Sequence, residues 1–189
     1  MQGIRTKQQE VFSEINKMKI DICVLTETKK KGKGTETVGE YIHIFSGVNK
    51  ETRAKRGVSV AIHKRLKNNI KSWDEIDEQI ITVEIHKNHR QMIIIGVYAP
   101  SDDADPLTKD MFFNKQTHII SDIKHDKELF LLGDFNSRTG TETNSPVVGQ
   151  YGERSTTNDN GLRLRGMCES LNLKIMNGFF PHRDIHKFT

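Results

Sequence analysis

The sequence predicts a mixed α/β domain with more than one sheet layer. Short apolar runs of strand length recur along the 189 residues, whereas few segments show helical spacing. Some of these runs follow one another as in a hairpin, so the strict strand–helix alternation of a doubly wound sheet is absent. No repeat, low-complexity tract or linker divides the chain. We therefore expect a single domain over residues 1–189.

Helices are expected in the N-terminal, central and C-terminal parts of the chain. Apolar residues of segment 5–18 fall close to one helical face. A second helix is expected to begin at Asp105, a capping residue, and Pro106, since proline is favoured at the first helical position, and to extend to about residue 124. A third is expected around residues 164–171.

Strands are expected where short apolar runs are bounded by turn or polar residues. The expected ranges are 20–25, 41–45, 58–62, 80–85, 91–98, 128–132 and 173–176. The Lys/Gly-rich stretch before residue 41 and the Gly/Thr/Ser/Asn-rich stretch 137–160 are expected to be loops.

Composition excludes several classes of protein. No apolar stretch approaches the roughly 20 residues that span a bilayer, and the start of the chain lacks the apolar region of a secretory signal. We therefore expect an intracellular protein, in the nucleus or cytoplasm, without a membrane partner. Cys23 and Cys168 both lie in apolar patterns and are expected to be reduced, which excludes a disulfide-linked partner and a cysteine zinc site. The sequence does not indicate the oligomeric state.

Two acidic residues stand directly beyond apolar strands. Glu27 follows ICVLT and Asp134 follows FLLG, positions at the rim of a sheet where ligands commonly bind. Either residue alone is more typical of a turn or a cap, but as a pair they suit Mg²⁺, which takes one or two carboxylates together with water and phosphate oxygens. Asn136, placed by strand alternation on the same side as Asp134, and Tyr98, at the end of IIIGVY, are polar groups suited to contact a phosphate.

Basic residues cluster in short runs. The 29 Lys and Arg exceed the 25 Asp and Glu, and the pI near 9.0 hints at a polyanionic partner. The main runs are Lys29–Lys33, Arg53–Arg56 and Lys64–Lys67. On charge alone, such runs are more typical of solvated loops than of a phosphate-binding surface.

Four segments, in this order, resemble the endonuclease/exonuclease/phosphatase family: LTETK with Glu27, GVYAPS with Tyr98, LLGDFNSRTG with Asp134 and Asn136, and NDNGLRLRGMCESLNLKIMNGFF. They are most similar to the endonuclease domains of LINE-type (non-LTR) retrotransposons and to craniofacial development protein 2-like sequences. The resemblance implies a four-layered α/β sandwich, with two mixed β-sheets packed face to face and helices outside. It also implies a retroelement-derived, endonuclease-like phosphodiester hydrolase that requires Mg²⁺ or Mn²⁺ and acts on nucleic acid. DNA is favoured over RNA as the partner, but the sequence leaves DNA, RNA and a smaller phosphate ester open as substrates.

The resemblance implies a role for each matching residue. Glu27 corresponds to the metal ligand, Asp134 to the aspartate that orients the attacking water, Asn136 to the amide on the phosphate, and Tyr98 to the tyrosine on the scissile phosphate. Thr189 corresponds to a threonine beside the substrate.

The basic loops are expected along the nucleic-acid backbone. Lys29, Lys31 and Arg56 are their expected substrate-binding residues.

Both ends depart from the family pattern. The opening strand with its Asn is not matched at the start of the chain, and the closing Ser-Asp-His segment does not follow Thr189. We therefore expect the domain to be incomplete at its N- and C-terminal strands. Two alternatives stay open: a catalytically inactive remnant that keeps the fold and binds nucleic acid weakly, and an incomplete gene model.

Overall fold

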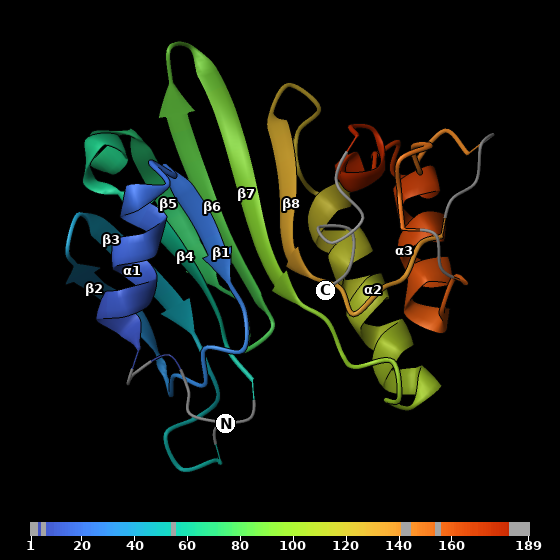
Figure 1. The fold of residues 1–189 in the computed structure, drawn as a ribbon, viewed down its shortest axis with the longest axis horizontal. Coiled ribbons are helices and arrows are strands. Elements are labelled where there is room, and N and C mark those ends of the chain that lie inside the picture. Colours follow the sequence, from blue (N-terminus) through green and yellow to red (C-terminus); the bar gives the residue numbers. More distant parts are fainter. Residues whose placement is uncertain (1–3, 5–6, 54–55, 141–144, 154–155, 182–189) are drawn as a thin grey trace. The chain divides into compact units, whose positions relative to one another are not determined.

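The structure is a computed structural model that describes residues 4, 7–53, 56–140, 145–153 and 156–181 (Figure 1). The chain falls into two compact units. The first contains residues 1–98 and 125–134, and the second contains residues 99–124 and 135–189. The expectation of one domain over residues 1–189 stays a prediction.

The first unit consists of two four-stranded sheets with one α-helix. Its elements are α1 (Gln8–Lys17), β1 (Ile22–Leu25), β2 (Lys33–Val38), β3 (Tyr41–Ser46), β4 (Val58–His63), the 3-10 helix η2 (Lys64–Asn69), β5 (Ile70–Glu75), β6 (Ile80–Lys87), β7 (Arg90–Tyr98) and β8 (Glu128–Asp134).

The two sheets differ in strand direction. The first has the order β1-β4-β3-β2, and all neighbouring strands described in it are antiparallel. The second has the order β5-β6-β7-β8, in which β7 and β8 run parallel. Their inner faces form one apolar core, to which both sheets contribute β-branched side chains such as Val60 and Ile62 from β4 and Ile81, Val83 and Ile85 from β6. The expected α/β sandwich is confirmed.

Helix α1 packs on the outer face of the first sheet. Its buried residues Phe12 and Ile15 contact Tyr41 and Ala61. The Tyr41 hydroxyl donates to the Ile20 carbonyl at 2.7 Å, which satisfies the polar end of a side chain that is otherwise fully buried. This outer layer therefore fixes the segment leading into β1.

The second unit contains α2 (Pro106–Ser121), α3 (Asp159–Ser170) and the 3-10 helix η3 (Met176–Gly178). Asp105 caps α2 by accepting from the Thr108 amide at 2.9 Å, and Pro106 takes the first helical position, as predicted. Asn158 caps α3 by accepting from the Gly161 amide at 2.8 Å.

The sequence prediction fails at three described segments. β2 was expected to be a loop and β5 was not expected, because KGTETV and IKSWDE are polar segments at the edges of their sheets. The strand expected over 173–176 is wrong: Ile175 makes an isolated bridge to Val148, and η3 follows immediately.

Two further features of the described residues concern membrane spans and cysteines. Within the described residues, no helix combines the length and apolar character needed to cross a bilayer. Cys23 and Cys168 are both free thiols, Cys168 fully buried and Cys23 partly so.

We expect the inter-sheet core to dominate the stability of the first unit. Ile81 is fully buried between the sheets, so Ile81→Ala should lower the free energy of unfolding by about 2–5 kcal/mol. Ile81→Val should cost about 0.5–1.5 kcal/mol because it removes a single methylene. Urea unfolding measures both, and equal small losses would contradict this account of the core.

Candidate active site

The candidate site of the first unit lies where β1, β7 and β8 end. Figure 1 shows these three strands ending on the same side of the sandwich. The Tyr98 hydroxyl, at the last residue of β7, donates to Glu27 Oε1 at 3.1 Å. Residues separated by 71 positions in the chain are thus in direct contact.

The pairing of β7 with β8 places Asp134 beside Tyr98. The two residues are partners in the parallel register, at the last position of each strand. Gly133 makes this pairing possible, because it has φ +137° and a side chain there would collide with the Val97 carbonyl. The structure therefore brings together Glu27, Tyr98 and Asp134, three of the residues singled out by the sequence.

The local charges keep the Tyr98 phenol protonated. Burial, the hydrogen bond to Glu27 and the negative charges of Glu27 and Asp134 raise the pKa of Tyr98 to about 12, against a smaller opposing effect of Arg56. The phenol is therefore a hydrogen-bond donor throughout the neutral range.

Arg56 belongs to the same site. Its Nη1 donates to Gln79 Oε1 at 3.2 Å, and Gln79 Nε2 donates to the Tyr98 carbonyl at 3.0 Å. Glu78 lies 3.9 Å from the guanidinium, whose side chain stays 39% exposed. Gln79 thus holds a partly exposed cation beside Tyr98. Gln79 was not predicted as a site residue, because it lies in a short polar connection without a motif.

Glu27 occupies a strained backbone conformation. Its φ is +51°, and that of Lys29 is also +51°, a left-handed conformation that costs a non-glycine residue about 1 kcal/mol or more. The Thr28 amide between them donates to the Gly57 carbonyl at 3.1 Å, and Thr28 is buried. Any side chain at Gly57 would collide with the Thr28 hydroxyl. Close packing against Gly57 therefore holds the turn that carries Glu27.

The basic run Lys29–Lys33 is not one exposed cationic surface. Lys30 is 6% exposed, lies over the Phe45 ring with its Nζ 3.9 Å from the centroid, and forms an ion pair with Glu36. Lys33 donates to the carbonyls of Glu75 and Ile76.

The two lysines predicted to bind substrate differ in setting. Lys31 is exposed and donates to the Lys50 carbonyl at 3.0 Å. Lys29 is partly buried.

Glu36 is the centre of a polar cluster beneath α1. It also accepts from Gln8 and lies 2.9 Å from His43 Nδ1. Partial burial of Glu36 opposes its ionisation, but the hydrogen bonds from Lys30, His43 and Gln8 outweigh this effect and lower its pKa to about 2. Burial lowers the pKa of His43, against the opposing effect of Glu36. The cluster links α1, β2 and β3 to the loop that follows Glu27.

Asn136 lies in the second unit, on the loop after β8. The strand ends at Asp134 and Asn136 has φ +48°, so the alternation expected to continue from Asp134 to Asn136 does not extend to it. Its side-chain amide donates to the Ala99 carbonyl at 3.0 Å. Asn158 and Asn160 donate to its backbone carbonyl at 3.0 and 3.3 Å.

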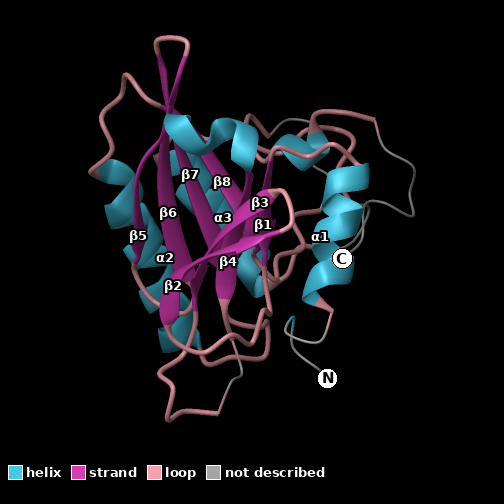
Figure 2. Ribbon diagram, turned by 90° about the vertical axis from the view of Figure 1, so that its left-hand side faces the viewer, coloured by secondary structure: helices cyan, strands magenta, loops and turns pink. Residues whose placement is uncertain are grey.

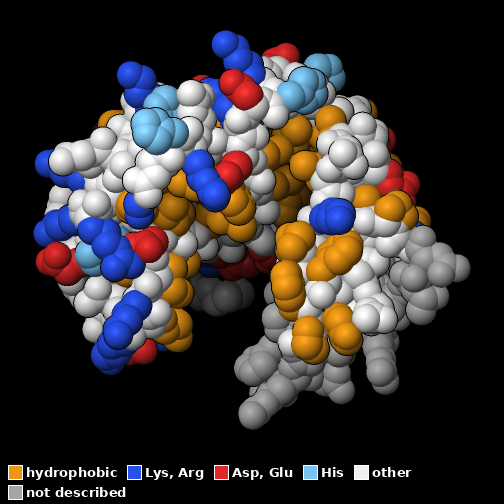
Figure 3. Space-filling model, turned by 90° about the horizontal axis from the view of Figure 1, so that it is seen from above, with side chains coloured by type: hydrophobic (Ala, Val, Ile, Leu, Met, Phe, Trp, Pro, Cys, Tyr) orange, Lys and Arg blue, Asp and Glu red, His pale blue; other side chains and the backbone are white. Residues whose placement is uncertain are grey.

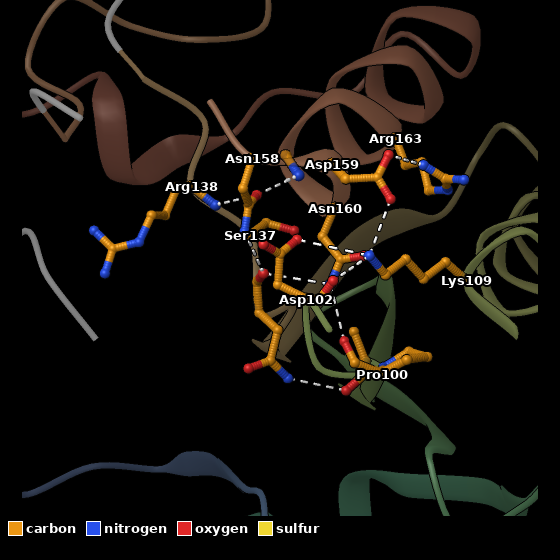
Figure 4. A network of polar contacts seen from close by, with 12 residues as sticks. Pro100, Asp102, Lys109, Ser137, Arg138, Asn158, Asp159, Asn160 and Arg163 are labelled. Carbon is orange, nitrogen blue, oxygen red and sulfur yellow. Dashed lines mark hydrogen bonds and ion pairs between the residues drawn. The ribbon is translucent and has the colours of Figure 1, made fainter. Parts of the chain in front are cut away.

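The NDN segment 158–160 holds this loop in place (Figure 4). Asn160 is fully buried and also donates to the Pro100 carbonyl at 2.9 Å. Asn158 accepts from the Arg138 amide at 2.9 Å. The segment thus fixes both the loop after β7 and the loop after β8. These contacts could not be predicted from the sequence.

A buried lysine anchors the same segment. Lys109 of α2 is 3% exposed, and its Nζ donates to the Asp102 carbonyl and to Asp159 Oδ2, the latter at 3.0 Å. Asp159 also pairs with Arg163. This network ties α2 to the start of α3 within the second unit.

Two further expectations concern Thr189 and the metal. Thr189 lies outside the described residues. Among the described residues, no three His, Cys, Asp or Glu side chains form a group arranged to hold a metal ion. A metal at this site would therefore depend on Glu27 and Asp134 together with water and phosphate oxygens, a donor set that Mg²⁺ and Mn²⁺ accept.

We expect the ionisation of Tyr98 to depend on Glu27. The phenol should ionise near pH 12, and Glu27→Gln should lower its pKa because the variant lacks the negative charge that disfavours phenolate. The absorbance difference between each protein and its Tyr98→Phe counterpart isolates this tyrosine. An unchanged Tyr98 pKa in Glu27→Gln would contradict the contact.

Acid should destabilise the chain through Glu36. Because the folded-state pKa of Glu36 is depressed to about 2, its stabilising effect is present above the unfolded pKa and is lost as pH falls from about 4.5 to 2. Urea unfolding over this range should show a shallower pH dependence for Glu36→Gln than for the native chain. Glu51→Gln, at an exposed turn position outside the helices, serves as the control and should leave the slope unchanged.

Comparison with known proteins gives two groups of relatives. The chain is 25% identical over 185 residues to craniofacial development protein 2 of Bos taurus and 24% identical to that of Tragulus javanicus, covering 97% of this chain and 31% and 32% of theirs. It thus spans about a third of the length of these curated relatives. No protein-family model matches.

Solved endonuclease structures share the fold. The AP endonuclease LMAP from Leishmania major matches with a TM-score of 0.63 at 10% identity, over 89% of this chain and 62% of that one. The endonuclease domain of TRAS1, a telomere-specific non-LTR retrotransposon, matches with a TM-score of 0.59 at 14% identity, over 93% and 67%. The chain therefore has the nuclease-type α/β sandwich fold, and its resemblance to the endonuclease/exonuclease/phosphatase family and to craniofacial development protein 2 is confirmed.

Proposed function

We propose that this chain is a retroelement-derived, divalent-metal-dependent phosphodiester hydrolase of the endonuclease type. The observation that carries the proposal is the arrangement around Tyr98, where a protonated phenol lies between two carboxylates and a guanidinium. Phosphodiester hydrolysis needs such a combination: oxygen ligands for a hard cation, donors to the phosphoryl oxygens and an acceptor for the attacking water. The nuclease-type fold of the relatives supports the same reaction class.

Each residue has a role that follows from its chemistry. Glu27 would hold Mg²⁺ or Mn²⁺ with help from Asp134, and the bound ion would offset charge on the phosphoryl oxygens. Tyr98 stays protonated and donates its hydrogen bond to Glu27. As a protonated phenol, Tyr98 would also be able to donate its hydrogen bond to a phosphoryl oxygen. Asp134 would accept a proton from the attacking water as the water oxygen bonds to phosphorus. The P–O bond to the leaving alcohol breaks in the same step, and solvent would supply the proton to that oxygen.

Cations near the site favour a phosphate-bearing partner. Arg56 is the best-placed of them, because Gln79 fixes its guanidinium while the side chain stays partly exposed. Lys29 and Lys31 on the loop after Glu27 are proposed to follow the nucleic-acid backbone. The roles of Asn136 and Thr189, as contacts to phosphate and substrate, remain part of this proposal.

The opposite end of the first unit has a mixed charge pattern. Figure 3 views this end, near the β6–β7 turn, and shows Lys and Arg side chains interspersed with Asp, Glu and His. A nucleic-acid backbone favours continuous cationic surface. DNA is the proposed substrate, bound at the end that carries Glu27, Tyr98 and Arg56.

Plasmid nicking tests the proposal. Supercoiled plasmid DNA incubated with the protein and Mg²⁺ should be nicked, and chelation should abolish the reaction. Glu27→Gln and Asp134→Asn should each lower the rate by about 10²–10⁴-fold, because each variant lacks a metal ligand or a proton acceptor.

Glu10→Gln removes a carboxylate from the exposed face of α1 and serves as the matched control, with the rate unchanged. Nicking that survives chelation, or that survives Asp134→Asn, would overturn the proposal. Salt-dependent DNA binding without nicking would instead establish the inactive, nucleic-acid-binding remnant.

A further inference from the structure

A groove of about 380 Å³ opens on the side of the first unit where β2 and β5 are the outer strands. Figure 2 views this side of the sandwich. Thr35 and Thr37 of β2, Trp73 of β5 and Lys67 of η2 line the groove. Its volume lies in the lower part of the range of roughly 300–1,000 Å³ that is typical of small-molecule sites. None of these residues contributes to the Glu27–Tyr98 site.

The strand registers explain why the sandwich stays open here. Thr35 is paired with Ile44 and Trp73 with Val83, and both partners belong to the inter-sheet core. Paired residues on neighbouring strands share a face, so the threonine and the tryptophan both lie on inner faces. The small threonine side chains do not fill the space at this edge. Trp73, which apolar neighbours would normally cover, is therefore 46% exposed.

Two residues along β2 from Thr35 and two along β5 from Trp73, a side-chain bridge joins the two sheets. Lys33 at the start of β2 donates to the carbonyls of Glu75, where β5 ends, and Ile76, the latter at 3.3 Å. η2 with Lys67 directly precedes β5 at the other end. A polypeptide strand added along β5 would have to displace the Lys33 bridge. The groove therefore suits a compact group better than a continuous strand.

The charge of the groove favours an anionic ligand. Lys67 contributes the one cation among the lining residues, and Glu36 the one acid. The Glu36 carboxylate is engaged by Lys30 and His43 in the cluster beneath α1. Within η2, Arg65 pairs with Asp21, whereas Lys67 lines the groove.

We propose that this groove binds an unpaired base of single-stranded nucleic acid, with the base stacked on the Trp73 indole and its phosphate beside Lys67. The hydroxyls of Thr35 and Thr37 would serve as hydrogen-bond partners for the base edge. Base–aromatic stacking tolerates any sequence because every base has a π-face. The base must be unpaired, because a base inside a duplex is already stacked on both faces. The inference rests on the proposed function in one respect: both take nucleic acid as the partner.

The chain's single tryptophan makes the groove directly observable. Tryptophan emission is recorded while single-stranded oligothymidine is titrated in the presence of a chelator, so that no hydrolysis intervenes. We expect saturable quenching, and we expect duplex DNA of the same length to quench less. Anisotropy of a labelled oligothymidine gives the affinity independently of Trp73.

The variants separate stacking from charge. Trp73→Ala should weaken binding by on the order of tenfold, while Trp73→Phe should retain most of it because an aromatic face remains. Lys67→Ala should lower the slope of log affinity against log salt by about 0.7, the value for one phosphate contact on a single strand. Lys87→Ala, an exposed lysine at the end of β6, should leave affinity for the labelled oligothymidine and quenching unchanged. Urea unfolding shows whether each variant is folded.

Several outcomes would overturn the proposal. The first is that oligothymidine does not change the tryptophan emission. The second is that the native chain and Lys67→Ala bind oligothymidine with equal affinity at every salt concentration. Emission that changes with protein concentration alone would assign the groove to a second copy of the chain. Because the titration excludes hydrolysis, a failure here alongside intact plasmid nicking overturns this inference alone. Binding without nicking overturns only the proposed hydrolysis.

Discussion

The parallel pairing of β7 with β8 determines the geometry of the candidate site. A parallel connection cannot be made by a tight turn, so the chain leaves the sheet after Tyr98 and returns at Glu128 after the segment that contains α2. The pairing then aligns the two strand ends, so that Tyr98 and Asp134 become neighbours. Gly133 allows the backbones to approach this closely. The electrostatics of the phenol follow from that alignment and from the contact with Glu27.

Some of the basic residues of the chain are used inside the protein. Lys30 and Lys109 are buried against carboxylates, and Lys33 bridges two strand edges. Such pairs fix local geometry, since a buried charge without a partner is strongly destabilising. Not all of the 29 Lys and Arg residues are therefore available to a ligand. Arg56 and Lys67, both at least partly exposed, lie at two separate places on the first unit.

Much of the fold and part of the site could be predicted because the sequence patterns that indicate them lie within short segments of the chain. The apolar strands ending at Glu27, Tyr98 and Asp134 were visible as runs of residues, and Asp105 with Pro106 marked the start of α2. Edge strands such as β5 carry polar residues on one face and lack a comparable signal. Gln79 and Asn160 were missed as site residues because their importance lies in contacts to distant carbonyl groups. Pairings of that kind depend on tertiary structure, which local patterns do not encode.

At Glu27, the residue types that best suit the backbone conformation are not those that best suit the chemistry of the site. Its left-handed φ of +51° suits glycine or asparagine, which adopt this region with little penalty. Either residue would relax the turn, but neither would provide a carboxylate to Tyr98. A sequence optimised for thermal stability alone would therefore drift away from glutamate here. In a library of variants selected only for folding, loss of the acid at position 27 should be among the tolerated or favoured changes.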